Sequence, residues 1–171
     1  SYLSAESTQK NQLRSRYTSL ARGRLLIGIA WKSGAGRTGR TRSFEIEDLN
    51  PLLRHPGALF INLQYGDITD DIQTIKDRGG VDIHVDRSIN QMEDMDGFAA
   101  QIAALDLVVT AANTTVHVAG ALGVPTDVLI PGVADWRWLG RGSKSIWYPS
   151  VRLHRQGALE SRQKYVQDLA E

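Results

Sequence analysis

The chain has 171 residues, of which 42% are hydrophobic and 23% are charged, a composition typical of one globular domain with a sizeable core. Its 20 lysines and arginines against 19 aspartates and glutamates leave a net charge of +1, so the overall charge favours no nucleic-acid partner. The absence of cysteine excludes disulfides, thiolate metal ligands and cysteine nucleophiles.

The sequence also argues against a membrane-spanning segment. The first residues are polar rather than signal-like, and no apolar run reaches about 18 residues, the length that a spanning helix needs. Together with the missing cysteines, this pattern favours a cytoplasmic protein.

Residues 1–24 are polar and basic, and they predict an N-terminal segment with an outer helix. The sparse apolar positions of this helix are Leu3, Leu13, Tyr17 and Leu20. Residues 25–31 (LLIGIAW) predict the first buried strand, and a loop rich in glycine and arginine follows at 32–42.

Two helices and two strands are predicted next. Residues 44–53 predict a helix that His-Pro-Gly terminates, and residues 58–64 (ALFINLQ) predict the second strand. The positions expected to face inward in the helix are Ile46, Leu49, Leu52 and Leu53. A short helix at 71–78 and a weaker third strand at 81–85 follow, with Gly79 and Gly80 between them.

The central part of the chain contains a helix, a strand and a second helix. Asp96 is the expected cap of a helix that runs through Ala104, and residues 105–111 predict a strand that is buried on both faces. The helix after Asn113 is expected to end at Gly123, because glycine adopts the left-handed cap and a proline follows. The inward positions of the first helix are Phe98, Ile102 and Leu105, and the small residues expected to pack closely on the sheet from the second helix are Gly120 and Ala121.

The last part of the chain begins with a strand at 128–130. The aromatic residues that follow, and that predict packed cover rather than an exposed linker, are Trp136, Trp138, Trp147 and Tyr148. Residues 151–154 predict an edge strand, and residues 160–170 predict a closing helix. Strands that alternate with helices predict an α/β fold with a doubly wound parallel sheet, so we expect residues 25–171 to form a single Rossmann-like domain.

The turn after the strand at 105–111 is the strongest candidate for a functional site. Asn113 is a good N-cap, and a right-handed βαβ crossover leaves the following helix N-terminus at the carboxyl ends of the strands. Free N–H groups and the positive end of the helix dipole favour a phosphate there. The hydroxyls of Thr114 and Thr115 and the imidazole of His117 can donate to the same anion. His117 also has a simpler interpretation as a structural helix residue.

The loop at 32–42 has three interpretations. Residues 34–39 match the dinucleotide motif G-x-G-x-x-G, but Gln64 stands where that motif needs an acidic residue, and the helical pattern resumes only near Glu45. Residues 34–41 nearly match a P-loop, although Arg40 replaces its lysine. The third interpretation is a mobile loop whose arginines stay solvated until a ligand arrives.

The aspartates at 67, 70 and 71 form the only acidic cluster that suggests a metal. Such clusters usually mark a turn and the start of a helix. We therefore expect no metal site and no cofactor.

Seven blocks in this order resemble a known family: GIAWKSG, RSF, LQYGD, DGFAAQIAALDLVV, NTTVHVAGALGVP, DWRWL and WYPSVRLHRQ. They resemble the carboxy-terminal half of bacterial glycosyltransferases that follow tetratricopeptide repeats, and the resemblance covers nearly the whole chain from Leu3. The family is related to lipopolysaccharide heptosyltransferases and, more distantly, to peptide O-GlcNAc transferases. The resemblance implies a Rossmann-like half of the two-domain type B glycosyltransferase fold, which holds the nucleotide of the sugar donor.

The resemblance also implies a set of donor-binding residues. These are Lys32 after the first strand, Gln64 and Tyr65 in a loop on the nucleoside side, and Asn113, Thr114, Thr115 and His117 in a phosphate turn of the Asp-Thr-x-x-x-His type. Asn113 departs from the usual aspartate, whose carboxylate could hold a donor-sugar hydroxyl. On this basis, an Asn113→Asp substitution is expected to strengthen sugar-nucleotide binding.

The sequence thus predicts the domain of a glycosyltransferase that binds a nucleotide-diphosphate sugar as donor substrate. We expect a fragment or truncated paralogue that is inactive alone and acts with an amino-terminal glycosyltransferase half or with tetratricopeptide repeats in a longer protein. The alternatives are a non-catalytic protein-association domain that keeps this fold and a P-loop-like nucleotidase. No catalytic residue is assigned.

Overall fold

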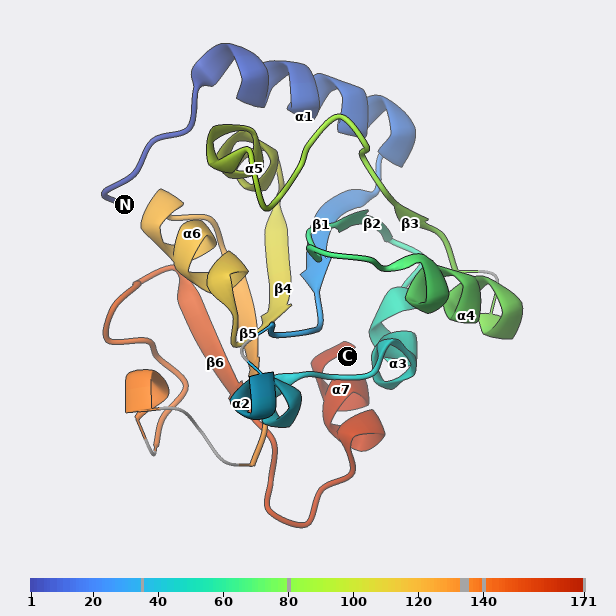
Figure 1. Ribbon diagram of the computed structural model, residues 1–171, viewed down its shortest axis with the longest axis vertical. Helices are drawn as coiled ribbons and strands as arrows, with labels where there is room; N and C mark the ends of the chain where they lie inside the picture. The colour runs from blue at the N-terminus through green and yellow to red at the C-terminus, as the bar shows by residue number, and fades with distance from the viewer. Residues whose placement is uncertain (35, 80, 133–135, 140, 171) are drawn as a thin grey trace.

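The central element of the structure is a parallel sheet whose six strands have the order β3-β2-β1-β4-β5-β6 (Figure 1). The computed structural model describes residues 1–34, 36–79, 81–132, 136–139 and 141–170, without the side chains of residues 36–38 and 79. The strands are β1 (Leu25–Ala30), β2 (Ala58–Asn62), β3 (Ile83–His84), β4 (Leu107–Ala111), β5 (Thr126–Ile130) and β6 (Val151–Arg155). This order and direction confirm the predicted doubly wound α/β fold.

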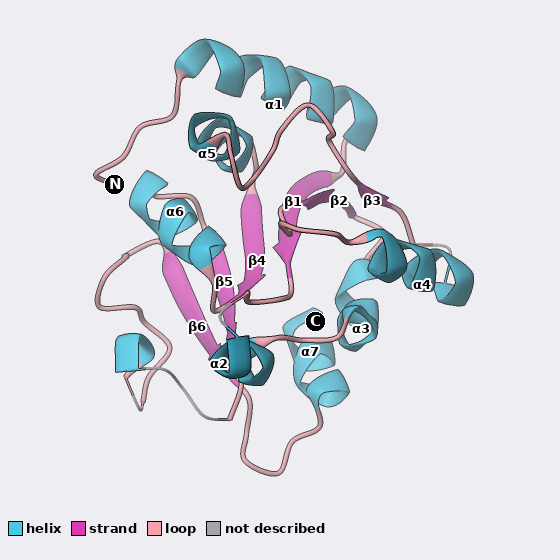
Figure 2. Cartoon of the chain, in the orientation of Figure 1, coloured by secondary structure: helices cyan, strands magenta, loops and turns pink. Residues whose placement is uncertain are grey.

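Helices cover both faces of the sheet (Figure 2). The helices are α1 (Ser7–Ala21), α2 (Gly36–Arg42), α3 (Asn50–Leu53), α4 (Thr69–Gly79), α5 (Met95–Ala103), α6 (Thr114–Leu122) and α7 (Arg162–Ala170), with 3-10 turns η1 (Ile46–Leu49) and η2 (Trp136–Trp138). Side chains of α1, α5 and α6 pack in one core cluster, and side chains of η1, α3, α4 and α7 pack in another.

The strand β1 shows why its sequence is apolar throughout. Leu26 and Ala30 belong to the first cluster, whereas Ile27 and Ile29 belong to the second. Because successive side chains point to opposite faces, a strand covered on both sides has no polar face. The prediction of a doubly buried first strand is confirmed.

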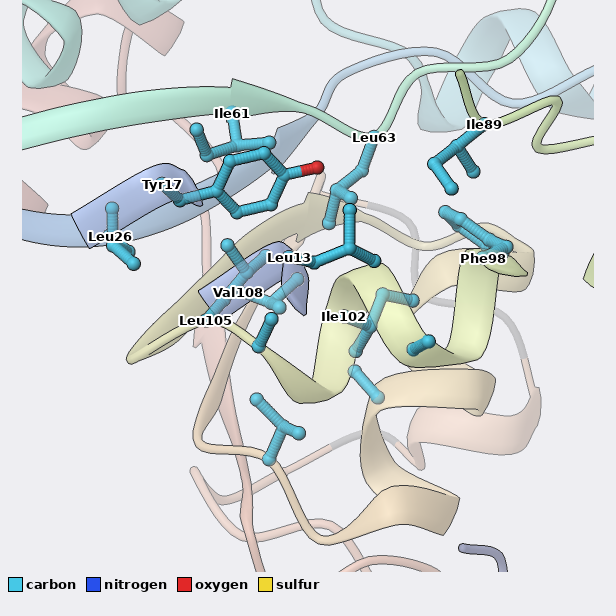
Figure 3. Packing of buried hydrophobic residues seen from close by; sticks show 14 of the residues in the cluster. Leu13, Tyr17, Leu26, Ile61, Leu63, Ile89, Phe98, Ile102, Leu105 and Val108 are labelled. Carbon is cyan, nitrogen blue, oxygen red and sulfur yellow. The ribbon is translucent and has the colours of Figure 1, made fainter. Parts of the chain in front are cut away.

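Helix α1 packs on the outside of the sheet, as predicted, but with a partly different set of residues. Leu13, Tyr17 and Ala21 are buried, and the first two lie among side chains from β1, β2, β4 and α5 (Figure 3). Leu3 and Leu20 are 49% and 43% exposed. The two outer positions of the predicted apolar set therefore do not contribute to the core.

Two local predictions need correction. The cap of α5 is Asp94, whose carboxylate accepts from the Gly97 backbone N–H at 2.8 Å, and Asp96 lies inside the first turn. The single helix expected at 44–53 is divided into η1 and α3, although its four predicted apolar positions are all buried. Pro51 lies in the first turn of α3, where a missing N–H costs nothing, so it permits a new helix to begin.

Gly120 faces a different neighbour from the one expected. A Cβ atom at Gly120 would lie 2.4 Å from Cγ of Tyr148, so this face of α6 packs against the segment before β6 rather than against the sheet. Ala121 is buried in the same cluster as Tyr148. At position 120 the predicted need for a small residue holds, but its cause is the Tyr148 ring.

The predicted aromatic cover is only half buried. Trp138 and Tyr148 are 2% and 8% exposed, and both pack in the cluster around β5 and β6. Trp136 and Trp147 are 69% and 49% exposed. Within the described residues, no helix is long and apolar enough to cross a membrane.

Candidate functional site

A pocket of about 840 Å³ opens where the chain leaves β1 and β4. These strands are neighbours in the sheet but not in sequence, so the crossovers leave in opposite directions and a crevice forms between them. The lining residues are Ser33, Gly34, Arg42, Tyr65, Gln91, Met92, Met95, Phe98, Ala112, Asn113, Thr114, His117, Arg137 and Trp138.

Asn113 fixes the floor of this pocket. Its Oδ1 accepts from the Thr115 backbone N–H at 2.9 Å, which caps α6 as predicted, and also from the Thr110 hydroxyl at 3.1 Å. Its Nδ2 donates to the Lys32 carbonyl oxygen at 3.0 Å. The amide therefore joins the end of β1 to the start of α6 by using a donor and an acceptor at once.

The two threonines have different environments. Thr114 is exposed and lines the pocket beside the first amides of α6. Thr115 is fully buried, and its hydroxyl oxygen has no hydrogen-bond partner among the described residues. Of the two predicted hydroxyls, only that of Thr114 lies at the pocket surface.

His117 lines the pocket one turn into α6 and is half-buried. Its ring stacks on Trp138 with centroids 5.5 Å apart, and its Nδ1 lies 3.1 Å from the Tyr148 hydroxyl. Burial and the neighbouring Tyr2 raise the pKa of Tyr148 to about 12, so this hydroxyl keeps its proton at neutral pH. When it donates to Nδ1, the neutral imidazole carries its proton on Nε2, the tautomer that can donate to an anion.

Lys32 is directed away from the residues that line the pocket. Its ammonium pairs with the Asp71 carboxylate, with Nζ 2.6 and 2.8 Å from the two oxygens. The same carboxylate accepts from the Trp31 indole N–H at 2.9 Å. Lys32 thus ties β1 to α4, and its backbone rather than its ammonium contacts the floor of the pocket.

Gln64 and Tyr65 also differ in their roles. Gln64 is buried, and its Oε1 accepts from the backbone N–H groups of Trp31 and Lys32 at 3.0 and 2.7 Å. Tyr65 lines the pocket, where its hydroxyl accepts from the Gly34 N–H at 2.8 Å. Gln64 therefore holds the end of β1, and only Tyr65 is available to a ligand.

The glycine-rich loop forms a helix earlier than its sequence predicts. Helix α2 begins at Gly36, inside the G-x-G-x-x-G match and not near Glu45, whereas Ala35 lies outside the described residues. The strand β2 is still followed by Gln64 instead of an acidic residue. In a P-loop, the residues before the last glycine and lysine form a loop that wraps a phosphate, but residues 36–38 here already belong to α2. The nucleotidase interpretation stays a prediction, and this helix is an argument against it.

Several pocket residues were not predicted as site residues. Arg42 and Arg137 bring two guanidinium groups from distant segments, and no acidic residue is among the described residues that line the pocket. Met92, Met95 and Phe98, from the start of α5 and the segment before it, supply an apolar wall. Arg42, Arg137 and Phe98 fall in sequence blocks of the resemblance, which was the signal available for them.

Two aspartates of the acidic cluster at 67, 70 and 71 have structural partners. Asp67 caps the turn before α4 by accepting from the Thr69 N–H at 2.9 Å, and Asp71 is paired with Lys32. Within the described residues, no group of three or more histidine and acidic side chains could hold a metal ion.

Comparisons with known proteins agree with this architecture. No protein-family model matches the chain. It is similar to glycosyl transferase family 9 from Veillonella parvula, with a TM-score of 0.63 and 13% identity over 91% of this chain and 42% of that one. It is also similar to Escherichia coli ADP-heptose lipopolysaccharide heptosyltransferase II, with a TM-score of 0.62 and 17% identity over 98% of this chain and 51% of that one. The chain has the Rossmann-like fold of the type B glycosyltransferases.

One curated relative is similar in sequence. Protein FlbA from Caulobacter vibrioides is 41% identical over 127 residues, which are 74% of this chain and 21% of FlbA. The chain thus spans about a fifth of FlbA and about half of the similar solved structures.

Proposed function

We propose that the pocket binds the diphosphate and nucleoside of a nucleotide sugar, and that the chain is the donor-binding domain of a glycosyltransferase. The observation that carries this proposal is the mixed chemistry of the pocket lining. The lining includes Thr114 and His117 at the start of α6 and two arginines, Arg42 and Arg137, and it also includes apolar residues, Met92, Met95 and Phe98. A diphosphate suits the first set of residues, and a nucleoside suits the second.

The same groups would also contribute to catalysis. As the bond between sugar and diphosphate breaks, negative charge grows on the leaving phosphate. Helix N–H groups, the His117 imidazole and two guanidinium groups that are already oriented would stabilise that charge more than they stabilise the bound donor. The chain would in this way assist departure of the nucleoside diphosphate.

We also propose that transfer needs a second domain. The similar glycosyltransferases are about twice as long as the matched region, and a second wall is needed to hold an acceptor opposite the donor. An amino-terminal glycosyltransferase half, with or without tetratricopeptide repeats, would supply that wall in a longer protein. We further propose that such a protein uses a nucleotide-diphosphate sugar as its donor substrate and is located in the cytoplasm.

Calorimetric titration tests the proposal. The chain should bind ADP or UDP, or the corresponding nucleotide sugars, without magnesium, because protein groups face the phosphates. Binding of ATP or GTP only in the presence of magnesium would instead favour a nucleotidase. Heat changes that are absent for every nucleotide, with the protein shown to be folded by circular dichroism, would contradict donor binding.

A protein-association domain is the second candidate, and one observation favours it. Trp136, Ile146 and Trp147 are exposed, and the two indoles pack edge to face with centroids 6.5 Å apart. Tryptophan in an exposed aromatic group is frequent where proteins associate. This candidate would be preferred if nucleotides fail to bind and Trp136→Ser with Trp147→Ser abolishes self-association measured by light scattering.

A further inference from the structure

The apolar wall of the pocket includes a segment that has little regular structure of its own. Between β3 and α5, residues 86–94 form turns but no helix or strand. Gln91 and Met92 of this segment line the pocket, and Met95 follows at the start of α5. We call residues 86–95 the wall segment. Since its backbone makes no sheet ladder, its position depends on side-chain contacts with neighbouring elements.

The main polar anchor of the wall segment is Asp86. Its carboxylate, which is almost fully buried, accepts from the Tyr17 hydroxyl at 2.8 Å and from an Arg16 guanidinium nitrogen at 3.0 Å. It also accepts from the Ser88 backbone N–H at 3.0 Å, which shapes the turn itself. The anchor therefore reaches from α1 to a segment about 70 residues later in the sequence.

The Tyr17 hydroxyl extends this anchor to α5. It accepts from Nε2 of Gln101 at 3.1 Å, and both side chains are fully buried. Gln101 lies on α5, the helix that also carries Met95 and Phe98. One hydroxyl therefore connects α1, the wall segment and the helix behind the pocket.

An apolar anchor lies beside the polar one. Ile89 of the wall segment is buried in the same cluster as Leu13 of α1 and Phe98 of α5 (Figure 3). Phe98 also lines the pocket. The packing that holds α1 in place is thus continuous with the packing of the apolar wall.

From these contacts we propose that Tyr17 and Asp86 are positioning residues that hold the wall segment in the geometry that receives the nucleoside. The inference rests on the proposed function, because it assigns the nucleoside to this pocket. Neither residue lines the pocket. Removing the Tyr17 hydroxyl would leave two buried polar groups without this partner, so the wall segment would move or admit water.

The test compares two substitutions on the same helix. Tyr17→Phe keeps the ring but removes the hydroxyl. Arg14→Gln is the matched control, because Arg14 pairs with Asp106 at 2.7 Å and donates to the Ala104 carbonyl at 3.0 Å, and so fastens α1 to the turn between α5 and β4 rather than to the wall segment. Amide hydrogen exchange of residues 87–95 is measured without ligand, and calorimetry gives the affinity for ADP as the probe.

In Tyr17→Phe, exchange of the wall segment is expected to become about tenfold faster and ADP binding about tenfold weaker, the effect of one lost buried hydrogen bond. Arg14→Gln should leave both unchanged even if its melting temperature falls. Asp86→Asn, which keeps an acceptor for Tyr17, should retain more ADP affinity than Asp86→Ala. Equal behaviour of Tyr17→Phe and Arg14→Gln would overturn the inference.

The two failures are distinguishable. If the unsubstituted chain binds ADP and Tyr17→Phe binds it equally well, the positioning role is wrong and the proposed function stands. If the unsubstituted chain binds no nucleotide, the proposed function fails. Amide exchange of the wall segment that is faster in Tyr17→Phe but not in Arg14→Gln would still show that Tyr17 and Asp86 hold this segment in place.

Discussion

Asn113 shows how a single amide satisfies requirements that a carboxylate cannot. The side chain is 6% exposed, and it accepts from the Thr115 N–H while it donates to the Lys32 carbonyl oxygen. An aspartate could still cap α6, but it has no N–H for Lys32 at neutral pH. The local hydrogen bonds thus explain why asparagine stands at this position.

The expected gain of Asn113→Asp in sugar-nucleotide affinity stays a prediction, and the hydrogen bonds of Asn113 predict a separate effect on stability. The substitution would leave the Lys32 carbonyl without its donor and would place a charge beside it, so we expect a loss of about 1–3 kcal/mol in the free energy of unfolding. Chemical denaturation at pH 7 measures this loss. Asn113→Ser is the control, because it keeps a capping oxygen and adds no charge. A variant as stable as the unsubstituted chain would disprove the role of the amide.

The hydrogen bonds of Asp86 predict how the free energy of unfolding depends on pH. Burial alone would raise the pKa of Asp86, but hydrogen bonds from Ser88 and Tyr17 and the charge of Arg16 hold it below its usual value. Because the folded pKa is the lower one, this contribution to stability is complete above the unfolded pKa of about 3.9 and is lost as the pH falls through the folded value.

Asp86→Asn should accordingly flatten the acid limb of the stability curve. We expect the variant to be less stable than the unsubstituted chain at pH 7 but to lose less stability between about pH 4 and pH 2. Urea denaturation midpoints over this range provide the comparison. Parallel curves for the two proteins would show that Asp86 does not have a lowered pKa.

At the residue scale, the sequence predicted the position of the pocket better than the directions of the side chains. Asn113, Thr114 and His117 follow from the end of an apolar strand and the start of a helix, and all three line the pocket. Lys32 and Gln64 lie at a similar strand end, yet their directions depend on partners 39 and 32 residues away, Asp71 and the backbone of Lys32. Strand and helix patterns contain no information on such partners.

At the scale of elements, α6 depends on close approach to Tyr148. The Tyr148 ring occupies the space that a side chain at Gly120 would need, and Tyr148 shares a buried cluster with Val116 and Ala121 of α6. Sequence periodicity predicted a small residue at position 120 because it lies on an inward face. It could not identify the neighbour, which comes from a loop 28 positions later.

Gly120→Leu should therefore destabilise the fold. The new side chain must displace Tyr148 or shift α6, and overpacking of this kind costs about 1–3 kcal/mol. Gly132→Ala is a suitable control, since a Cβ atom there would meet no atom within 4 Å. Thermal denaturation of both variants gives the measurement. Equal melting temperatures would show that α6 has room at this position.

Helix α2 illustrates what sequence periodicity misses. Its sequence, GRTGRTR, contains two glycines and no apolar stripe, so nothing predicts a helix. The structure stabilises its end through Ser43, whose hydroxyl donates to the Gly39 carbonyl at 2.8 Å and accepts from the Ser33 N–H at 2.9 Å. A tertiary contact with the loop after β1 therefore compensates for weak helix propensity.

At the scale of the whole molecule, the strand order decides where a ligand can bind. The strands β1 and β4 are adjacent at the centre of the sheet, and the pocket lies at their carboxyl ends. Alternating strands and helices predicted this architecture, because parallel strands connected by right-handed crossovers have few possible arrangements. The arginines of the pocket could not be predicted in the same way. Arg42 and Arg137 line one pocket only because the fold brings their segments together.

The central claim is that a nucleoside diphosphate binds at the N-terminus of α6. Amide chemical shifts of the isotope-labelled chain, followed during titration with ADP, test it most directly. We predict the largest shifts at Gly34, Tyr65, Thr114 and Thr115, and a half-saturating ADP concentration that rises about 10- to 150-fold in His117→Ala, the effect of one charge-assisted hydrogen bond. Shifts confined to the opposite ends of the strands, or no shifts with millimolar ADP, would contradict the claim.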